Sequence, residues 1–240
     1  MEIKPIQVQS LKEACIAQLE QMILSGELTI GERLPSERDF AARLKVSRPV
    51  LHQALVDLEA KGLVQIEPRR GVFISDFRRD GSLAMLSSLL SYHNGSLGPE
   101  ISQSMLEMRQ LLETETARLA AVNRTDEQLA WLKYLLDREI MAPVDGPEAL
   151  TDFDFEFHLS IAIASGNLVY PMMINSFKEV YTSLTGKFFE EYFHTGVIAD
   201  VHRFHIKLVA AIADQDPDSA AQTMSEMLTH GEGYLKGVTP

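Results

Sequence analysis

The N-terminal third of the chain changes from helical spacing of apolar positions to strand-like runs. Over residues 10–25 the apolar side chains recur every three or four positions, as on one face of an amphipathic helix, and Gly26 is a natural stop. Two further helical stretches follow, each beginning after a serine, and two short apolar runs joined by Pro-Arg-Arg come next. We therefore predict helices over residues 10–25, 37–44 and 48–61, and strands over residues 63–67 and 71–75.

The order of these elements predicts a winged helix-turn-helix domain. The second and third helices are separated only by the tight turn at residues 45–47, and a two-stranded hairpin follows the third helix. In such a domain the helix after the turn enters the major groove of DNA by its N-terminal end. The hairpin then follows the adjacent groove as a wing.

Beyond residue 80 the helical spacing continues almost throughout. Residues 83–92 predict a short apolar helix, and helical periodicity runs from Ile101 to about Lys236 without a convincing strand. The predicted fold class is mainly α, with an all-α bundle after the winged domain. We divide the chain into a winged domain at 1–77, a linker and connecting helix at 78–100, and an all-helical domain at 101–240.

Charge divides the chain in the same way. Residues 1–79 hold 12 Lys and Arg against 11 Asp and Glu, whereas residues 80–240 hold 10 against 23. The formal net charge of the whole chain is -12. Such asymmetry indicates a part that binds a polyanion joined to an acidic part. The positive residues also cluster, since five of them lie between positions 33 and 48.

Candidate DNA contacts lie at the start of the third predicted helix and at the tip of the hairpin. Arg48 is long enough to hold a guanine edge through two hydrogen bonds, and the free N–H groups at the helix start suit a phosphate. The same charges could instead be solvated on a small helical domain that binds protein. The candidate residues are Arg38, Ser47, Arg48, Pro49, Val50, His52, Arg69, Arg70 and Gly71.

Composition excludes several other classes of protein. No apolar run approaches the ~18 residues of a membrane span, and the first ten residues lack the order of a signal peptide. The single cysteine, Cys15, excludes an internal disulfide and fits a reducing compartment. We therefore expect a cytoplasmic protein with no membrane partner.

In the second part of the chain, Asp154 and His158 are four residues apart and share one helical face. A carboxylate and an imidazole so placed can bind one metal ion, and His202 and His205 follow later. The alternative is a buried histidine that is hydrogen-bonded to a carboxylate. The spacing alone leaves both interpretations open.

Two further polar residues are candidates for binding an effector. Arg109 lies in an otherwise apolar helical face, and a buried guanidinium needs an anion. That anion is either Glu113, four residues on, or the carboxylate of an effector. Asn167, which follows Gly166, is either a polar pocket residue or an ordinary loop residue.

The sequence GERLPSERDFAARLKVSRPVLHQALVDLEAKGLV, followed by RRGVFIS, resembles the DNA-binding domain of the GntR superfamily. The resemblance covers residues ~10–76 and implies a transcriptional regulator. Two positions depart from the usual pattern. His52 stands where the family usually has arginine, and Arg69 stands where the wing usually has glycine. The first departure implies a different operator base or a weaker phosphate contact at that position.

The second part resembles the effector domain, of the FCD type, found in the FadR subfamily. The similar stretches are EMRQLLETETARLAA, the Asp154–His158 pair, ASGN and HIKLVAAIADQDPDSAA. Many such domains bind a divalent metal such as zinc or nickel, and the resemblance assigns Asp154, His158 and His205 as ligands. The fourth ligand position falls on Met227, and His230, one turn further on, could replace it only if the helix shifted.

A second resemblance leads to a different effector. IASGN and PMMINSFKEVYTSLTGKFFEE are similar to segments of the acyl-CoA-responsive member of the same subfamily, which binds no metal. The Met and Phe side chains of residues 172–193 would then line an acyl pocket, or they simply pack a core.

These observations predict a ligand-responsive DNA-binding regulator, a repressor that binds a palindromic double-stranded operator as a homodimer. Its effector would be a small carboxylate bound directly or through the metal, or else an acyl-CoA. We expect no enzyme activity, because no general base or nucleophile stands beside the candidate metal ligands. A metalloenzyme built on Asp154, His158 and His205 and a protein-interaction adaptor are the alternatives, and protection of a specific operator distinguishes the regulator from both.

Overall fold

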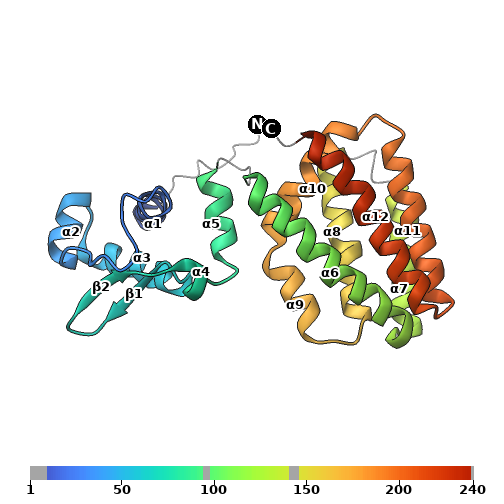
Figure 1. Cartoon of the computed structure of the whole chain (residues 1–240), viewed down its shortest axis with the longest axis horizontal. Coiled ribbons are helices and arrows are strands. Elements are labelled where there is room, and N and C mark those ends of the chain that lie inside the picture. Colours follow the sequence, from blue (N-terminus) through green and yellow to red (C-terminus); the bar gives the residue numbers. More distant parts are fainter. Residues whose placement is uncertain (1–9, 94–97, 141–145, 239–240) are drawn as a thin grey trace, which may run out of the picture. The chain divides into compact units, whose positions relative to one another are not determined.

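The computed structural model describes residues 10–93, 98–140 and 146–238 (Figure 1). The chain forms two compact units, at residues 1–95 and 96–240. The first unit contains all of the described strands, and all regular elements described in the second unit are helices. The predicted fold class, mainly α with a winged helix-turn-helix before a helical bundle, is confirmed.

The first unit is a three-helix domain with a two-stranded wing. The antiparallel strands pair from Val64 with Ile74 to Glu67 with Gly71, and Arg33 forms an isolated bridge with Phe73. Side chains of α1 and α3 meet the inner faces of both strands in one apolar core, which includes Leu19, Leu51, Leu55, Leu58, Val72 and Ile74. The elements are α1 (Leu11–Leu24), α2 (Glu37–Leu44), α3 (Arg48–Ala60), β1 (Val64–Glu67) and β2 (Gly71–Ile74).

Local sequence explains the turn that separates α2 from α3. Ser36 caps α2 by accepting a hydrogen bond from the Asp39 backbone N–H at 3.2 Å, and Ser47 caps α3 through the Val50 N–H at 3.4 Å. Between them Lys45 takes the left-handed conformation, with φ of 56°, which turns the chain sharply. The first residues of α3, Arg48 and Pro49, are exposed to solvent.

Two short helices that follow the wing pack on the same unit. These are α4 (Phe77–Asp80) and α5 (Met85–Tyr92). The Met85 side chain joins the apolar core of the winged domain, and a side chain at Gly62 would collide with the backbone of Asp80. The boundary between the two compact units lies at residues 95 and 96, so α4 and α5 belong to the first unit.

A buried polar contact also ties α5 to α1 and to the end of α3. Lys61 Nζ lies 2.6 Å from Glu20 Oε1 and 2.9 Å from Ser88 Oγ, and the Ser88 hydroxyl donates to Glu20 at 2.7 Å. Glu20 and Ser88 are both buried. The three groups therefore satisfy one another's hydrogen bonding inside the domain. A charge buried there without such partners would destabilise the fold.

Lys61→Met should lower the free energy of unfolding by about 1–3 kcal/mol, because it leaves the buried Glu20 carboxylate without its cation. Urea unfolding followed by circular dichroism measures this change. The matched control is Lys12→Met, which breaks an exposed pair with Asp57. That variant should cost under about 1 kcal/mol. Equal, small losses in the two variants would contradict the assigned role of Lys61.

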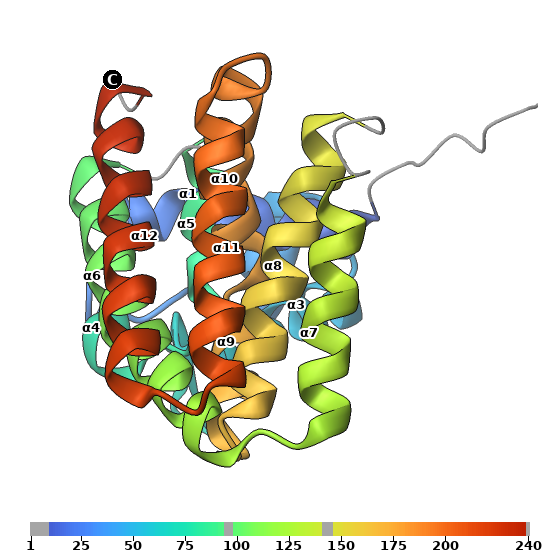
Figure 2. The same cartoon turned by 90° about the vertical axis from the view of Figure 1, so that its right-hand side faces the viewer.

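The second unit is an all-helical bundle in its described part, as expected (Figure 2). Helix α6 packs against α8 and α12, while α11 packs against α7 and α12 and α10 packs against α8. Phe188 and Phe189, expected either in an acyl pocket or in a core, are buried in one of its apolar clusters. The elements are α6 (Pro99–Asn123), α7 (Asp126–Glu139), α8 (Pro147–Ala164), α9 (Val169–Ser176), α10 (Lys178–Tyr192), α11 (Val197–Ala213) and α12 (Pro217–Val238).

Among the residues that the structure describes, no helix combines the length and the apolar character that crossing a bilayer requires. Cys15 is a free, buried cysteine in the core of the winged unit.

Candidate functional site

The start of α3 presents polar side chains to solvent. The Arg48 side chain is 71% exposed, and the His52 side chain, one turn later on the same face, is 51% exposed. Ser47 and Pro49 shape the first turn of the helix, and Val50 is half-buried beside them. The N-terminal end of α3 therefore offers two polar side chains, Arg48 and His52, to a bound polyanion.

Glu37, the first residue of α2, holds both of these side chains. Its Oε2 lies 3.2 Å from Arg48 Nε, and its Oε1 lies 3.1 Å from His52 Nδ1. Burial opposes ionisation of this carboxyl, but the hydrogen bonds from His52 and Arg48 outweigh it and keep its pKa below the ordinary value. Glu37 was not among the expected site residues, because its partners lie 11 and 15 positions away in the sequence.

The wing tip presents the second group of expected contacts. Arg69 takes the left-handed conformation with φ of 64°, and Gly71 has φ of 119°, which a residue with a side chain rarely adopts. Arg70 pairs with Glu67 and stands over the Phe73 ring at 5.7 Å. The exposed side chains of Arg69 and Arg70 thus lie at the tip of the hairpin.

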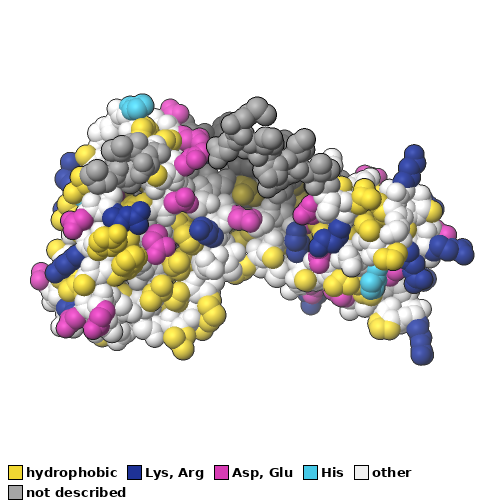
Figure 3. Space-filling model, turned by 180° about the vertical axis from the view of Figure 1, so that it is seen from behind, with side chains coloured by type: hydrophobic (Ala, Val, Ile, Leu, Met, Phe, Trp, Pro, Cys, Tyr) yellow, Lys and Arg dark blue, Asp and Glu magenta, His cyan; other side chains and the backbone are white. Residues whose placement is uncertain are grey.

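A groove of ≈ 470 Å³ runs between the start of α2, the start of α3 and the wing. Lys and Arg side chains gather on the winged unit in the face shown in Figure 3. Arginines of three elements line the groove, which suits phosphates, and Arg33 joins the expected Arg38, Arg48 and Arg69 there. Arg33 was not among the expected residues, although it belongs to the basic cluster at positions 33–48.

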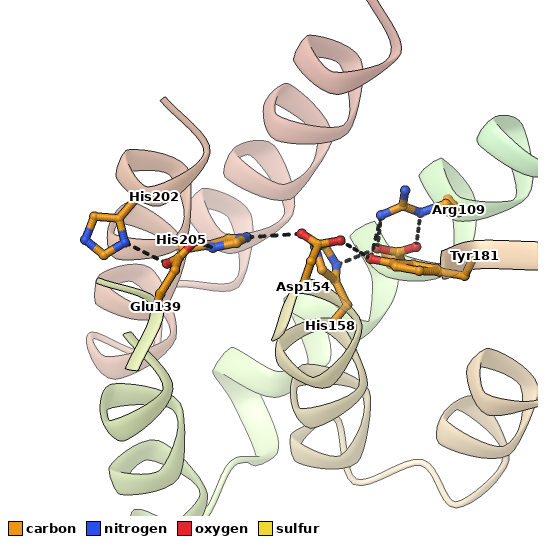
Figure 4. A network of polar contacts seen from close by, with 8 residues as sticks. Arg109, Glu139, Asp154, His158, Tyr181, His202 and His205 are labelled. Carbon is orange, nitrogen blue, oxygen red and sulfur yellow. Dashed lines mark hydrogen bonds and ion pairs between the residues drawn. The ribbon is translucent and has the colours of Figure 1, made fainter. Parts of the chain in front are cut away.

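A second candidate site lies inside the helical unit. Helix α8 carries Asp154 and His158, and α11 carries His205, all three buried (Figure 4). Asp154 Oδ1 lies 3.8 Å from His158 Nε2 and 3.9 Å from His205 Nε2. One ligand atom from each residue lies within 4.8 Å of the others. The structure thus brings together the three residues that the sequence had separated by up to 51 positions.

Two buried carboxylates orient the histidine rings. Glu139 of α7 lies 2.8 Å from His205 Nδ1 and 2.6 Å from His202 Nδ1, as Figure 4 shows. Glu113 Oε2 lies 2.5 Å from His158 Nδ1, although out of line for a well-formed hydrogen bond. A carboxylate can only accept, so Nδ1 of His205 carries a proton, and in a neutral ring its Nε2 lone pair faces Asp154. Burial opposes ionisation of Glu139, but His205 and His202 keep its pKa below the ordinary value.

Arg109, on α6, contacts Glu113 of the same helix and Tyr181 of α10. Its Nε donates to Glu113 Oε1 at 2.6 Å, and its Nη2 donates to the Tyr181 hydroxyl at 2.8 Å. Tyr181 in turn donates to Asp154 Oδ2 at 2.9 Å. Burial opposes ionisation of Glu113, yet the adjacent Arg109 and His158 lower its pKa to about 2. Burial raises the pKa of Tyr181 well above 10.0, so it remains a donor.

The residues present fit a divalent metal ion. A carboxylate oxygen and two imidazole nitrogens are a donor set used for zinc and nickel. The separations of 3.8 and 3.9 Å are shorter than the maximum of about 4.0–4.4 Å that two metal–ligand bonds of about 2.0–2.2 Å can bridge. His205 Nε2 is buried and has no hydrogen-bond partner among the described residues, which is costly unless a ligand completes it.

A small cavity of ≈ 60 Å³ opens beside this cluster. Its polar wall contains Arg109, Asp154 and His158, and its apolar wall comes from α10 and α12 and includes Phe188, Phe189 and Met227. A cavity of this size holds a few waters or a small polar molecule, since one water needs roughly 10–15 Å³. Arg109 is therefore paired with Glu113, one of its two expected partners, and also lines the cavity.

Other expected residues lie outside the cluster. His230 Nε2 lies 3.9 Å from Asp200 Oδ2, and its ring packs against Phe204 and Tyr234, so it is not among the clustered groups. Asn167 does not line the cavity, and its Oδ1 accepts hydrogen bonds from backbone N–H groups at the start of α9 instead. Met227 occupies the cavity wall where a fourth ligand was sought.

Two family models match the chain, and together they cover both units. The model for bacterial regulatory proteins of the gntR family matches residues 11–74, and the FCD domain model matches residues 104–230. The two matches coincide with the winged unit and with the bundle that holds the buried cluster.

Named relatives are similar over nearly the whole chain. The HTH-type transcriptional regulator Mce2R of Mycobacterium tuberculosis (strain CDC 1551 / Oshkosh) is 31% identical over 240 residues, covering 99% of this chain and 97% of its own. The HTH-type transcriptional repressor NanR of Klebsiella aerogenes is 31% identical, covering 94% and 85% respectively. The solved structure of Lar, which controls the expression of the Listeria monocytogenes agr system, matches with a TM-score of 0.65. At 16% identity, over 97% of this chain and 100% of that one, this likeness shows the fold alone.

Proposed function

The chain belongs to the GntR family of bacterial regulatory proteins and carries an FCD domain, and from this premise we propose that it is an effector-controlled repressor of the FadR subfamily. As a member of this family it is a DNA-binding transcriptional regulator and not an enzyme. In the proposal it binds a palindromic operator as a homodimer. Support for repression comes from the similarity to the repressor NanR.

The observation that carries the effector proposal is the cavity beside Asp154, His158 and Arg109. A divalent ion, zinc or nickel, would be held by Asp154, His158 and His205, and it would supply a Lewis acid for a carboxylate ligand. Arg109 would add a second positive group, because a guanidinium matches a carboxylate. The ≈ 60 Å³ volume favours a small carboxylic acid over a long acyl chain.

Effector binding would change operator affinity by a coupling free energy of about 1–3 kcal/mol. Native mass spectrometry of the full, untagged chain purified without chelator tests the first part of this proposal. A dimer carrying one metal ion per chain supports it. A metal-free dimer carrying a heavy organic adduct would favour an acyl-CoA regulator instead, and an effector that left operator affinity unchanged would contradict the coupling.

Arg48→Ala should weaken binding to a cognate operator by about 1–3 kcal/mol, or roughly 5- to 150-fold in Kd, because Arg48 would lose its two hydrogen bonds to a guanine edge. Fluorescence anisotropy with an operator selected from random DNA measures the change. Arg118→Ala, which removes a positive charge from the helical unit, is the control and should leave the Kd unchanged. Equal loss on random DNA would show that Arg48 contacts only phosphate.

A further inference from the structure

Glu37 forms hydrogen bonds with both Arg48 and His52 on the surface proposed to face DNA. Arg48 and His52 lie four residues apart on the exposed face of α3, and each contacts a different oxygen of the same carboxylate. The Glu37 side chain is only 21% exposed, whereas both partners are mostly or half exposed. The partly buried carboxylate is therefore a common anchor for the two more exposed side chains.

This contact selects which donors of Arg48 remain free. The guanidinium carries five N–H groups, and the Nε–H is directed to Glu37 Oε2 at 3.2 Å. Within the described residues the two terminal nitrogens have no such partner, and they lie at the exposed end of the side chain. Because guanine presents two acceptors, N7 and O6, side by side in the major groove, this terminal fork matches guanine.

The same contact selects the tautomer of His52. Glu37 Oε1 can only accept a hydrogen bond, so His52 Nδ1, 3.1 Å away, carries the proton. In a neutral imidazole the other nitrogen, Nε2, is then an acceptor. It lies on the opposite side of the ring from Nδ1, and it is free to meet a base in the part of the chain that the structure describes.

An acceptor in the major groove can pair only with a base that presents a donor there. Adenine presents the N6 amino group and cytosine presents the N4 amino group, whereas guanine and thymine present acceptors at the corresponding edge. Nε2 of a neutral His52 would therefore favour adenine or cytosine and disfavour guanine or thymine. An arginine at this position, which is a donor only, would favour guanine.

We propose that Glu37 is a specificity-determining positioning residue, which sets Arg48 to read guanine and His52 to read the amino group of adenine or cytosine. This inference rests on the proposed binding of α3 in the major groove. Glu37, a carboxylate that by itself would repel DNA, thereby gains a role in recognition. His52 and Arg48 would then bind bases of different chemistry.

The experiment is selection from a random double-stranded DNA library by the full chain at pH 8, where an ordinary histidine is neutral. The proteins compared are the unchanged chain, His52→Arg, Glu37→Ala and the control Glu27→Ala, which removes an exposed carboxylate from the loop after α1 in the same unit. Competition with single-base variants of the selected operator then measures the preference at each position.

We expect one operator position at which the unchanged chain prefers adenine or cytosine by roughly 5- to 150-fold. His52→Arg should convert that position to guanine. Glu37→Ala should reduce the preference both there and at the guanine read by Arg48, while Glu27→Ala should change neither. A purely structural role of Glu37 would weaken binding to all sequences alike and leave the base preferences intact.

Two outcomes overturn the inference while leaving the regulator proposal standing. In the first, the unchanged chain selects an operator, but His52→Arg and Glu37→Ala select the same bases. In the second, the position altered by His52→Arg shows guanine or thymine with the unchanged chain, so that Nε2 donates. Failure of the unchanged chain to enrich any sequence would instead refute the proposed function itself.

Discussion

Arg109→Met should lower the free energy of unfolding by about 3–5 kcal/mol, because it leaves a buried carboxylate without its cation. The Glu113 side chain is 1% exposed, and Arg109 donates to it through Nε at 2.6 Å. Methionine retains most of the apolar stem of the side chain, so the loss reports the charge and its hydrogen bonds. Urea unfolding followed by the fluorescence of Trp131, the single tryptophan, reports on the helical unit directly.

The control for this prediction is Arg118→Met on the same helix. Arg118 pairs with Glu115 three residues earlier, but its side chain is 41% exposed. That change should therefore cost under about 1 kcal/mol. The double variant Arg109→Met/Glu113→Gln should be more stable than Arg109→Met alone, because the uncompensated charge is gone. A double variant no more stable than the single one would show that Arg109 acts through packing instead.

His205→Ala should weaken the binding of Zn²⁺ or Ni²⁺ by on the order of 100-fold or more, since even the loss of an outer partner of a metal-bound histidine costs about 10- to 100-fold. The change reduces three donors to two and removes the buried Nε2 that has no hydrogen-bond partner in the described residues. Titration of the full chain with each metal in competition with a chromophoric chelator measures the affinity.

Two variants make the metal result specific. His230→Ala should bind metal as tightly as the unchanged chain, because His230 faces Asp200 and lies outside the cluster. Glu139→Gln should weaken binding by about 10- to 100-fold, because it disturbs the carboxylate that orients His205. If His205→Ala and His230→Ala bind metal equally well, then His205 is a core histidine satisfied by Glu139, the alternative that its sequence also allowed.

Much of the winged unit could be predicted because its signals are local. Ser36 and Ser47 mark the starts of α2 and α3, and each cap involves only the next three residues. The packing of α5 could not be predicted in this way. Met85 enters the winged core and Ser88 meets Glu20 across 68 positions, and neither contact leaves a local pattern.

At the second site the family resemblance predicted more of the clustered residues than helical spacing did, but it did not predict all of their surroundings. It assigned His205 beside Asp154 and His158. It also placed the fourth ligand position at Met227, with His230 as a possible replacement. In the structure, Met227 lines the cavity wall and His230 pairs with Asp200. Asn167 shows the same limit, because its position after Gly166 suits either a pocket residue or the acceptor of backbone hydrogen bonds that it is.

By itself, the sequence determined the helices, the wing, the basic turn and the placement of Asp154 and His158 on one face. These features depend on the periodicity of a helix or strand and on the few residues that begin and end it. Only the tertiary structure decided that Glu37 holds Arg48 and His52, and that Glu139 holds His205. Such contacts depend on how separate helices pack against each other, and residues far apart in the chain carry no spacing that records it.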